Sequence, residues 1–428
     1  MTWFTDARFG LFIHWGVYAA AARHEWVKRN ERLTDQQYQR YADHFDPDLF
    51  DPAAWAHEAA GAGMKYLVVT TKHHDGFCLW DSALTDYKAT RTPHGKDLLR
   101  PLLEAFRDRG LRTGLYYSLL DWHHPEFPVD LYHPQAEDEE FTAANKGRDM
   151  ARYTEYLHGQ VRELLTGYGP IDTMWFDFSY AGRGTGAKGP AEWQSEKLAG
   201  MVRELQPGIL INNRLGVPEL ADFTTPEQVM PPSGVPGHLP WEACQTMNGS
   251  WGYDRDNTDY KSADQLIRML IDTVSKDGNM LLNVGPNARG EFGPDELSRL
   301  REIGRWMRLH GRAIHGAGPV VFTPPQDCRY TLRGDRLYLH LFSWPMSHVH
   351  LPGLRGRVRY AQLLNDASEI PIMDVDPGNP MHHYLNGLPE DTLTLKLPPR
   401  PPDVAVPVIE MFLADPWPAR PGVPNPAR

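Results

Sequence analysis

The chain has 428 residues, 41% of them hydrophobic and 23% charged, and its 44 Lys and Arg against 55 Asp and Glu give a formal net charge of −11. This is the composition of a globular protein with room for one large domain and a smaller one. The negative balance excludes a broad affinity for phosphate backbones, so nucleic acid is not an expected partner.

No apolar run approaches the roughly 18 residues of a transmembrane helix, so no membrane partner is expected. Residues 1–8 lack the basic-then-apolar pattern of an export signal. Cys78, Cys244 and Cys328 stand far apart and in no metal-ligand spacing. We therefore expect a cytoplasmic protein, although a secreted or periplasmic protein trimmed of its signal peptide would show the same sequence features. The sequence leaves the oligomeric state open, including a homo-oligomer.

Short β-like runs alternate with amphipathic helical segments, the pattern of a parallel sheet wound by helices. Helices are expected over residues 51–64, 148–169 and 262–278. The segment 228–240 is too rich in Pro and Gly for a helix, so one barrel helix is expected to be missing. Eight runs are the number that closes a (β/α)8 barrel. They begin at Leu11, Tyr66, Arg112, Thr173, Ile209, Asp222, Trp241 and Asn279.

The helical periodicity ends near Gly316, and alternating segments separated by turn sequences follow it, as in "RLYLHLF" and "TLTLKLP". The fold class expected is therefore α/β, an irregular (β/α)8 barrel over residues 1–316 followed by a β-sandwich over 317–415. Residues 416–428, rich in proline, are expected to form a loose tail.

Polar and aromatic residues stand at the end of every predicted strand. In a (β/α)8 barrel the functional groups project from these carboxyl ends, so the residues are expected to meet at one mouth. The list along the chain is His14, Lys72, His73, His74, Asp75, Tyr116, Tyr117, Asp121, Asp177, Asn213, Arg214, Glu227, Glu242 and Asn283.

Three of these residues are candidate catalytic carboxylates. Asp177 ends an apolar strand, and Glu227 and Glu242 follow on later segments. Two carboxyl groups across a sugar-sized pocket are the machinery of glycoside hydrolysis, one attacking the anomeric carbon and the other acting as acid and then base. Tryptophans and tyrosines beside acidic residues, as in "MWFDF" and "WGYD", fit a sugar pocket. A metal site at His73 and His74 is disfavoured because adjacent strand residues point to opposite faces.

The motifs "ARFGLFIHWG", "TKHHDGF", "GLYYSLLDW", "MWFDF" and "WEACQTMNGSWGY" together resemble the α-L-fucosidases of glycoside hydrolase family 29, over about residues 9–316. The resemblance implies a retaining enzyme without metal or cofactor that releases terminal α-L-fucose from a fucosylated oligosaccharide or glycoconjugate. It implies that Asp177 is the nucleophile and that Glu227 is the first choice for the acid/base, with Glu242 as its rival or as a supporting partner. The residues that it assigns to substrate binding or to orienting the nucleophile are His14, Glu25, Trp26, His73, His74, Tyr117, Trp175 and Arg214.

Two other enzymatic interpretations remain open from the sequence. One is a hydrolase of a related sugar, such as an α-L-galactoside, and the other is a metal-dependent hydrolase that uses the histidines. A non-catalytic sugar-binding protein is disfavoured because Asp177 and both glutamates are present. Two long loops, 125–147 and 181–193, are expected on the catalytic face, where they would act as walls or lids if they are not merely solvated insertions.

Overall fold

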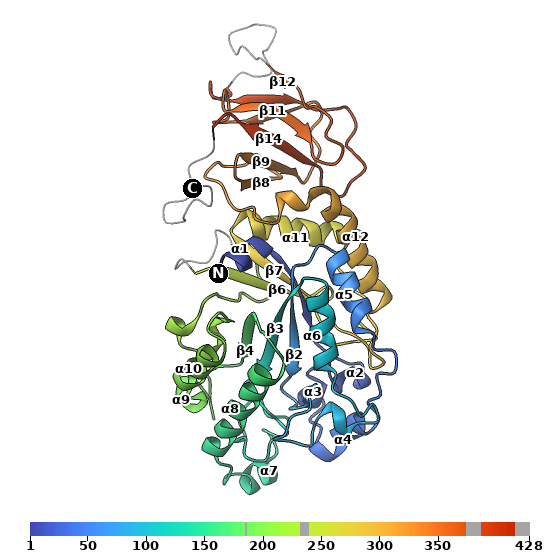
Figure 1. The fold of residues 1–428 in the computed structure, drawn as a ribbon, viewed down its shortest axis with the longest axis vertical. Helices are drawn as coiled ribbons and strands as arrows, with labels where there is room; N and C mark the ends of the chain where they lie inside the picture. The colour runs from blue at the N-terminus through green and yellow to red at the C-terminus, as the bar shows by residue number, and fades with distance from the viewer. Residues whose placement is uncertain (185, 232–238, 374–386, 416–428) are drawn as a thin grey trace. The chain divides into compact units, whose positions relative to one another are not determined.

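A computed structural model describes residues 1–184, 186–231, 239–373 and 387–415. Seven parallel strands form one curled sheet in the order β5-β4-β3-β2-β1-β7-β6 (Figure 1), which confirms a TIM-like barrel class. The strands are β1 (Phe9–Ile13), β2 (Tyr66–Lys72), β3 (Arg112–Ser118), β4 (Thr173–Asp177), β5 (Leu210–Ile211), β6 (Trp241–Gln245) and β7 (Gly278–Val284).

The strands are buried on both faces, as parallel strands covered by helices must be. Every residue of β1, β2 and β4 is buried. The helices that belong to this part of the chain are α2 (Tyr18–Ala21), α3 (Val27–Asn30), α4 (Asp35–Asp43), α5 (Pro52–Gly61), α6 (Leu99–Asp108), α7 (Glu139–Ala144), α8 (Met150–Gly167), α9 (Pro190–Trp193) and α10 (Ser195–Leu205). Asp51 caps α5 by accepting from the N–H of Ala54, with Pro52 in the first turn, as the sequence predicts.

The sixth predicted strand, the run from Asp222 to Glu227, is not a strand of the sheet, which corrects the prediction. Among the described residues it forms no strand, and it joins β5 to β6 through isolated parallel bridges of Phe223 with Asn212 and Thr224 with Trp241. Pro226 within the run has no N–H to donate, which limits the regular ladder. The barrel wall is therefore irregular on this side, although backbone hydrogen bonds from Asp222 to Ile211 and from Cys244 to Pro226 still connect the run to both neighbours. The non-helical link expected over 228–240 includes residues 232–238, which lie outside the described residues.

The chain divides into two compact units by its contacts. The first contains residues 9–261 and 279–301, and the second contains residues 2–8, 262–278 and the described residues from 302 onward. The helices α1 (Thr2–Ala7) and α11 (Ala263–Ser275) belong to the second unit, and α12 (Pro294–His310) runs through residues of both. The domain boundary expected at residue 316 stays a prediction.

The second unit carries two antiparallel sheets, as expected for a C-terminal β domain. Their orders are β10-β13-β12 and β11-β14-β9-β8. Side chains from both sheets, such as Leu351, Leu395, Leu339 and Met411, share one buried cluster. The strands are β8 (Cys328–Arg333), β9 (Arg336–Leu341), β10 (His348–Leu351), β11 (Val358–Leu363), β12 (Ile372–Met373), β13 (Leu393–Lys396) and β14 (Val408–Leu413). The loose tail expected over 416–428 lies outside the described residues.

Candidate active site

A pocket of about 510 Å³ opens among the carboxyl ends of the strands in the first unit. Its place agrees with the general position of active sites in this architecture. Ten of the residues singled out from the sequence line it, which are His14, Trp26, His73, His74, Tyr116, Trp175, Asp177, Asn213, Arg214 and Glu227.

Asp177 is the last residue of β4 and is held by three donors. The Tyr116 hydroxyl donates to Oδ2 at 2.8 Å, and Arg214 Nη1 and the N–H of Phe178 donate to Oδ1 at 2.8 and 2.9 Å. Burial would raise the pKa of Asp177, but the Arg214 guanidinium, His74 and these hydrogen bonds outweigh it and hold the pKa below its ordinary value. The carboxylate is therefore ionised and fixed in direction, the state that a nucleophile requires.

The backbone directly after Asp177 is strained. Phe178 has a φ of +77°, in the left-handed region that a residue with a bulky side chain rarely adopts. Such strain persists only where the surroundings enforce it, and it clusters at functional sites. Here it turns the chain sharply out of β4 and lets the Phe178 N–H donate to the Asp177 side chain.

Arg214 joins the two candidate catalytic carboxylates. It lies in a single 3-10 turn, Asn213–Leu215, and its Nη1 and Nη2 contact Asp177 and Glu227, each at 2.8 Å. The guanidinium carbon also lies 4.5 Å from the centre of the Trp175 ring. Since the Arg214 side chain is clamped by Thr225 through Nε as well, both carboxylates are placed relative to one rigid group.

Three histidines line the inner wall of the pocket. His14 Nδ1 pairs with Asn283 Oδ1 at 2.7 Å, and His74 Nδ1 pairs with Ser118 Oγ at 2.6 Å. Burial lowers the pKa of His14 to about 3 and that of His74 to about 4, and it lowers the pKa of His73 as well. Within the described residues, the buried Nδ1 of His73 has no hydrogen-bond partner. Neutral imidazoles offer one donor and one acceptor each, which suits sugar hydroxyls.

Glu242, Glu25 and Tyr117 do not line this pocket. Glu242 is 1% exposed, and its oxygens accept from the Tyr66 hydroxyl at 2.5 Å and from Trp175 Nε1 at 3.1 Å. Burial raises the pKa of Glu242 to about 7. Its position therefore fits support of the Trp175 ring better than contact with substrate.

Glu25 is fully buried and accepts from the N–H of Gly252 at 2.7 Å. The Tyr117 hydroxyl donates to Gln160 of α8 at 2.8 Å, whereas its neighbour Tyr116 faces the pocket. Tyr116 and not Tyr117 therefore lines the pocket, because successive strand residues point to opposite faces. The two-residue period of β3 is the sequence signal that would have found it.

Several residues of the pocket were not assigned a role from the sequence. Phe12 belongs to β1 and Tyr116 to β3, so both follow from strand geometry. Cys244 belongs to β6 and Asn213 to the 3-10 turn after β5. The remaining residues stand on loops, where no periodicity predicts the direction of a side chain. The unassigned lining residues are Phe12, Tyr116, Tyr132, Phe178, Ser179, Tyr180, Arg183, Asn213, Gly216, Cys244 and Trp251.

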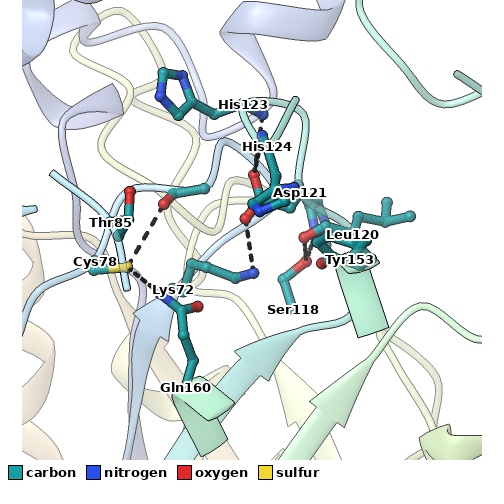
Figure 2. Close-up of polar contacts among 12 residues, drawn as sticks. Lys72, Cys78, Thr85, Ser118, Leu120, Asp121, His123, His124, Tyr153 and Gln160 are labelled. Carbon is teal, nitrogen blue, oxygen red and sulfur yellow. Dashed lines mark hydrogen bonds and ion pairs between the residues drawn. The ribbon is translucent and has the colours of Figure 1, made fainter. Parts of the chain in front are cut away.

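A buried ion pair joins the end of β2 to the loop after β3 (Figure 2). Lys72 and Asp121 are 0% and 1% exposed, and Lys72 Nζ lies 2.9 Å from Asp121 Oδ2. Asp121 Oδ1 accepts from the N–H groups of His123 and His124, so the same carboxylate shapes the loop after β3. The N–H of Trp122 in that loop donates to the carbonyl of His74 at 2.8 Å. The pair thus ties the histidine segment to the next strand end.

Among the described residues, no group of three or more His, Cys, Asp or Glu is placed to hold a metal ion, and no helix has the length and apolar character to span a bilayer.

The chain matches a family model described as Alpha-L-fucosidase over residues 1–312. It is 31% identical to the tissue α-L-fucosidase of Homo sapiens over 376 residues, which cover 81% of this chain and 76% of that protein. It is also 31% identical to an α-L-fucosidase of Dictyostelium discoideum, over 74% of this chain and 72% of that protein.

Solved structures agree with the sequence matches. The α-L-fucosidase isoenzyme 1 from Paenibacillus thiaminolyticus is 47% identical, with a TM-score of 0.90 and coverage of 96% of this chain and 98% of that chain. A family 29 α-L-fucosidase from Bacteroides thetaiotaomicron, described as a trapped covalent intermediate with 2-fluoro-fucosyl fluoride, is 27% identical, with a TM-score of 0.83 and coverage of 97% and 96%. The chain therefore belongs to the α-L-fucosidase family, glycoside hydrolase family 29.

Proposed function

We propose that this enzyme hydrolyses terminal α-L-fucose from oligosaccharides or glycoconjugates with retention of configuration. The observation that carries the proposal is that Asp177 and Glu227 line one pocket and contact the same guanidinium, that of Arg214. The trapped intermediate described for the relative from Bacteroides thetaiotaomicron supports a covalent route.

In the first step, an oxygen of the Asp177 carboxylate bonds to the anomeric carbon while the bond from that carbon to the leaving oxygen breaks. Glu227 donates its proton to the leaving oxygen. In the second step, water gives a proton to Glu227 and bonds to the anomeric carbon as the bond to Asp177 breaks. Two inversions at one carbon release fucose in its original configuration, and the proposal invokes no cofactor.

The floor of the pocket supports fucose over galactose. Phe12 is buried, and its ring centre lies 5.3 Å from that of Trp175 and 5.9 Å from those of Tyr116 and Trp251. Such an aromatic surface favours the C5 methyl group of fucose, since the hydroxymethyl group of galactose would be desolvated there without a partner.

The test is the stereochemistry of hydrolysis of an aryl α-L-fucoside, followed by proton NMR before the anomers equilibrate. We expect α-L-fucose as the first product, with and without a chelator, and a large preference over the matching α-L-galactoside. First release of the β anomer would contradict the double displacement. Loss of turnover with chelator would favour the metal-dependent alternative.

A further inference from the structure

Three aromatic rings form part of the pocket mouth, and we call Tyr132, Phe178 and Tyr180 the aromatic rim. All three line the pocket. Their ring centres lie 4.8 Å apart for Tyr132 and Phe178, 4.9 Å for Tyr132 and Tyr180, and 5.9 Å for Phe178 and Tyr180, each pair edge to face. Tyr132 and Phe178 are half-buried, whereas Tyr180 and the histidines of the inner wall are buried. Tyr132 and Phe178 therefore keep accessible apolar surface in the pocket, and the buried Tyr180 packs against both rings.

The two segments that carry the rim are joined by a buried ion pair. Asp130 and Lys188 are 4% and 3% exposed, and Lys188 Nζ lies 2.5 Å from Asp130 Oδ2. Lys188 Nζ also lies 4.3 Å from the centre of the Phe127 ring. A buried charge pair of this kind fixes geometry strongly, because removing either partner leaves the other charge without compensation.

The Asp130 carboxylate holds two rim residues directly. Its Oδ1 accepts from the N–H of Tyr132 at 2.8 Å, and its Oδ2 accepts from the Tyr180 hydroxyl as well as from Lys188. Gly186, with a φ of +73°, lets its segment approach closely, since an added Cβ would come within 3.1 Å of Asp130 Cβ. The loops expected to be walls or lids are thus locked together at this point.

We propose that the aromatic rim is a stacking platform for the sugar that leaves, and that the Asp130–Lys188 pair is its positioning device. This inference rests on the proposed function. In a pocket that removes a terminal sugar, the buried floor holds that sugar and the half-exposed mouth meets the rest of the substrate. Aromatic rings at the mouth suit the C–H face of a second sugar ring, so the substrate class is a fucosylated oligosaccharide rather than a fucoside with a small leaving group.

The test compares kcat/KM for an α-L-fucosyl disaccharide with kcat/KM for α-L-fucosyl fluoride, whose leaving group is too small to reach the rim. For Tyr132→Ala and Lys188→Met we expect the ratio of the two values to fall by roughly tenfold, the factor equivalent to one lost aromatic contact. Tyr132→Phe keeps the ring and should restore the ratio. A higher KM for the disaccharide should account for most of the change.

Lys72→Met is the matched control, because Lys72 at the end of β2 and Asp121 in the loop after β3 form a second buried ion pair whose residues do not line the pocket (Figure 2). It should lower kcat/KM for both substrates in proportion. Equal losses on both substrates for Tyr132→Ala would overturn the platform, as would a wild-type enzyme that hydrolyses the fluoride but no disaccharide. If Lys188→Met does not fold, the Tyr132→Ala variant still tests the stacking platform, because this substitution leaves the Asp130–Lys188 ion pair intact. Failure of the proposed function would appear separately, as no hydrolysis of the fluoride.

Discussion

The Tyr66 hydroxyl donates to Glu242 Oε2 at 2.5 Å inside the barrel. Glu242, the second acid/base candidate, is therefore hydrogen-bonded to a side chain of β2 and does not line the pocket. Burial raises the pKa of Glu242 to about 7 from an ordinary value of 4.5. Between these two values the folded protein binds more protons than the unfolded chain, so the unfolding free energy falls as pH rises.

Glu242→Gln should remove this pH dependence. Relative to wild type, the variant should gain unfolding free energy as pH rises from 5 to 8, by up to about 3 kcal/mol. Urea unfolding at a series of pH values measures the difference. A difference that does not change with pH would mean that Glu242 ionises normally in the folded protein.

Glu227→Ala and Glu242→Ala separate the two acid/base candidates. Glu227 lines the pocket with its side chain 43% exposed, so its removal should abolish proton donation to the leaving group. We expect kcat to fall by about 10²–10⁴ for fucosides with poor leaving groups and far less for good ones. Azide should accelerate Glu227→Ala and give α-L-fucosyl azide, with retained configuration. The same behaviour in Glu242→Ala would reverse the assignment.

Tyr116→Phe and Tyr117→Phe form a matched pair on neighbouring residues of β3. Tyr116 donates to Asp177, so its loss should lower kcat and kcat/KM by roughly tenfold or more. Tyr117 donates to Gln160, so its loss should cost about 1–3 kcal/mol of unfolding free energy with little change in kcat/KM. Steady-state kinetics and denaturant unfolding of both variants would expose a reversal of these roles.

His73→Ala and His74→Ala should keep the fold and lose turnover. Each removes a buried neutral imidazole from the pocket wall, and a lost hydrogen bond to a sugar hydroxyl should lower kcat/KM about 10- to 100-fold. Circular dichroism confirms folding, and rates on an aryl fucoside measure the loss. Undiminished kcat/KM in both variants would refute hydroxyl binding by this pair.

The sequence predicted the barrel class and most of the inner pocket because those residues stand at strand ends, whose carboxyl termini share one mouth. His14, Asp177 and Arg214 follow this rule. The rule did not place Tyr117, because the alternation within β3 turns its neighbour Tyr116 inward. The run at Asp222 is joined to its neighbours by isolated bridges and is not a regular strand, although Glu227 at its end lines the pocket.

The place of the aromatic rim in the pocket could not be predicted from the sequence, for a different reason. Tyr132 and Tyr180 stand on irregular loops and are positioned by Asp130, a contact that spans 50 residues between Asp130 and Tyr180. No local periodicity encodes such a pairing. Glu242 was predicted as a site residue because of its position on a strand. Its burial and its hydrogen bonds to Tyr66 and Trp175 depend on the tertiary fold, which the local sequence does not reveal.

The central claim is that Asp177 forms the bond to the anomeric carbon, and azide rescue of Asp177→Ala tests it most directly. With the carboxylate gone, azide fits the space and attacks from the same side, so the variant should be nearly inactive alone and should produce β-L-fucosyl azide, of inverted configuration, when azide is added. An α-configured product, or an Asp177→Ala enzyme that keeps wild-type kcat without azide, would contradict the account.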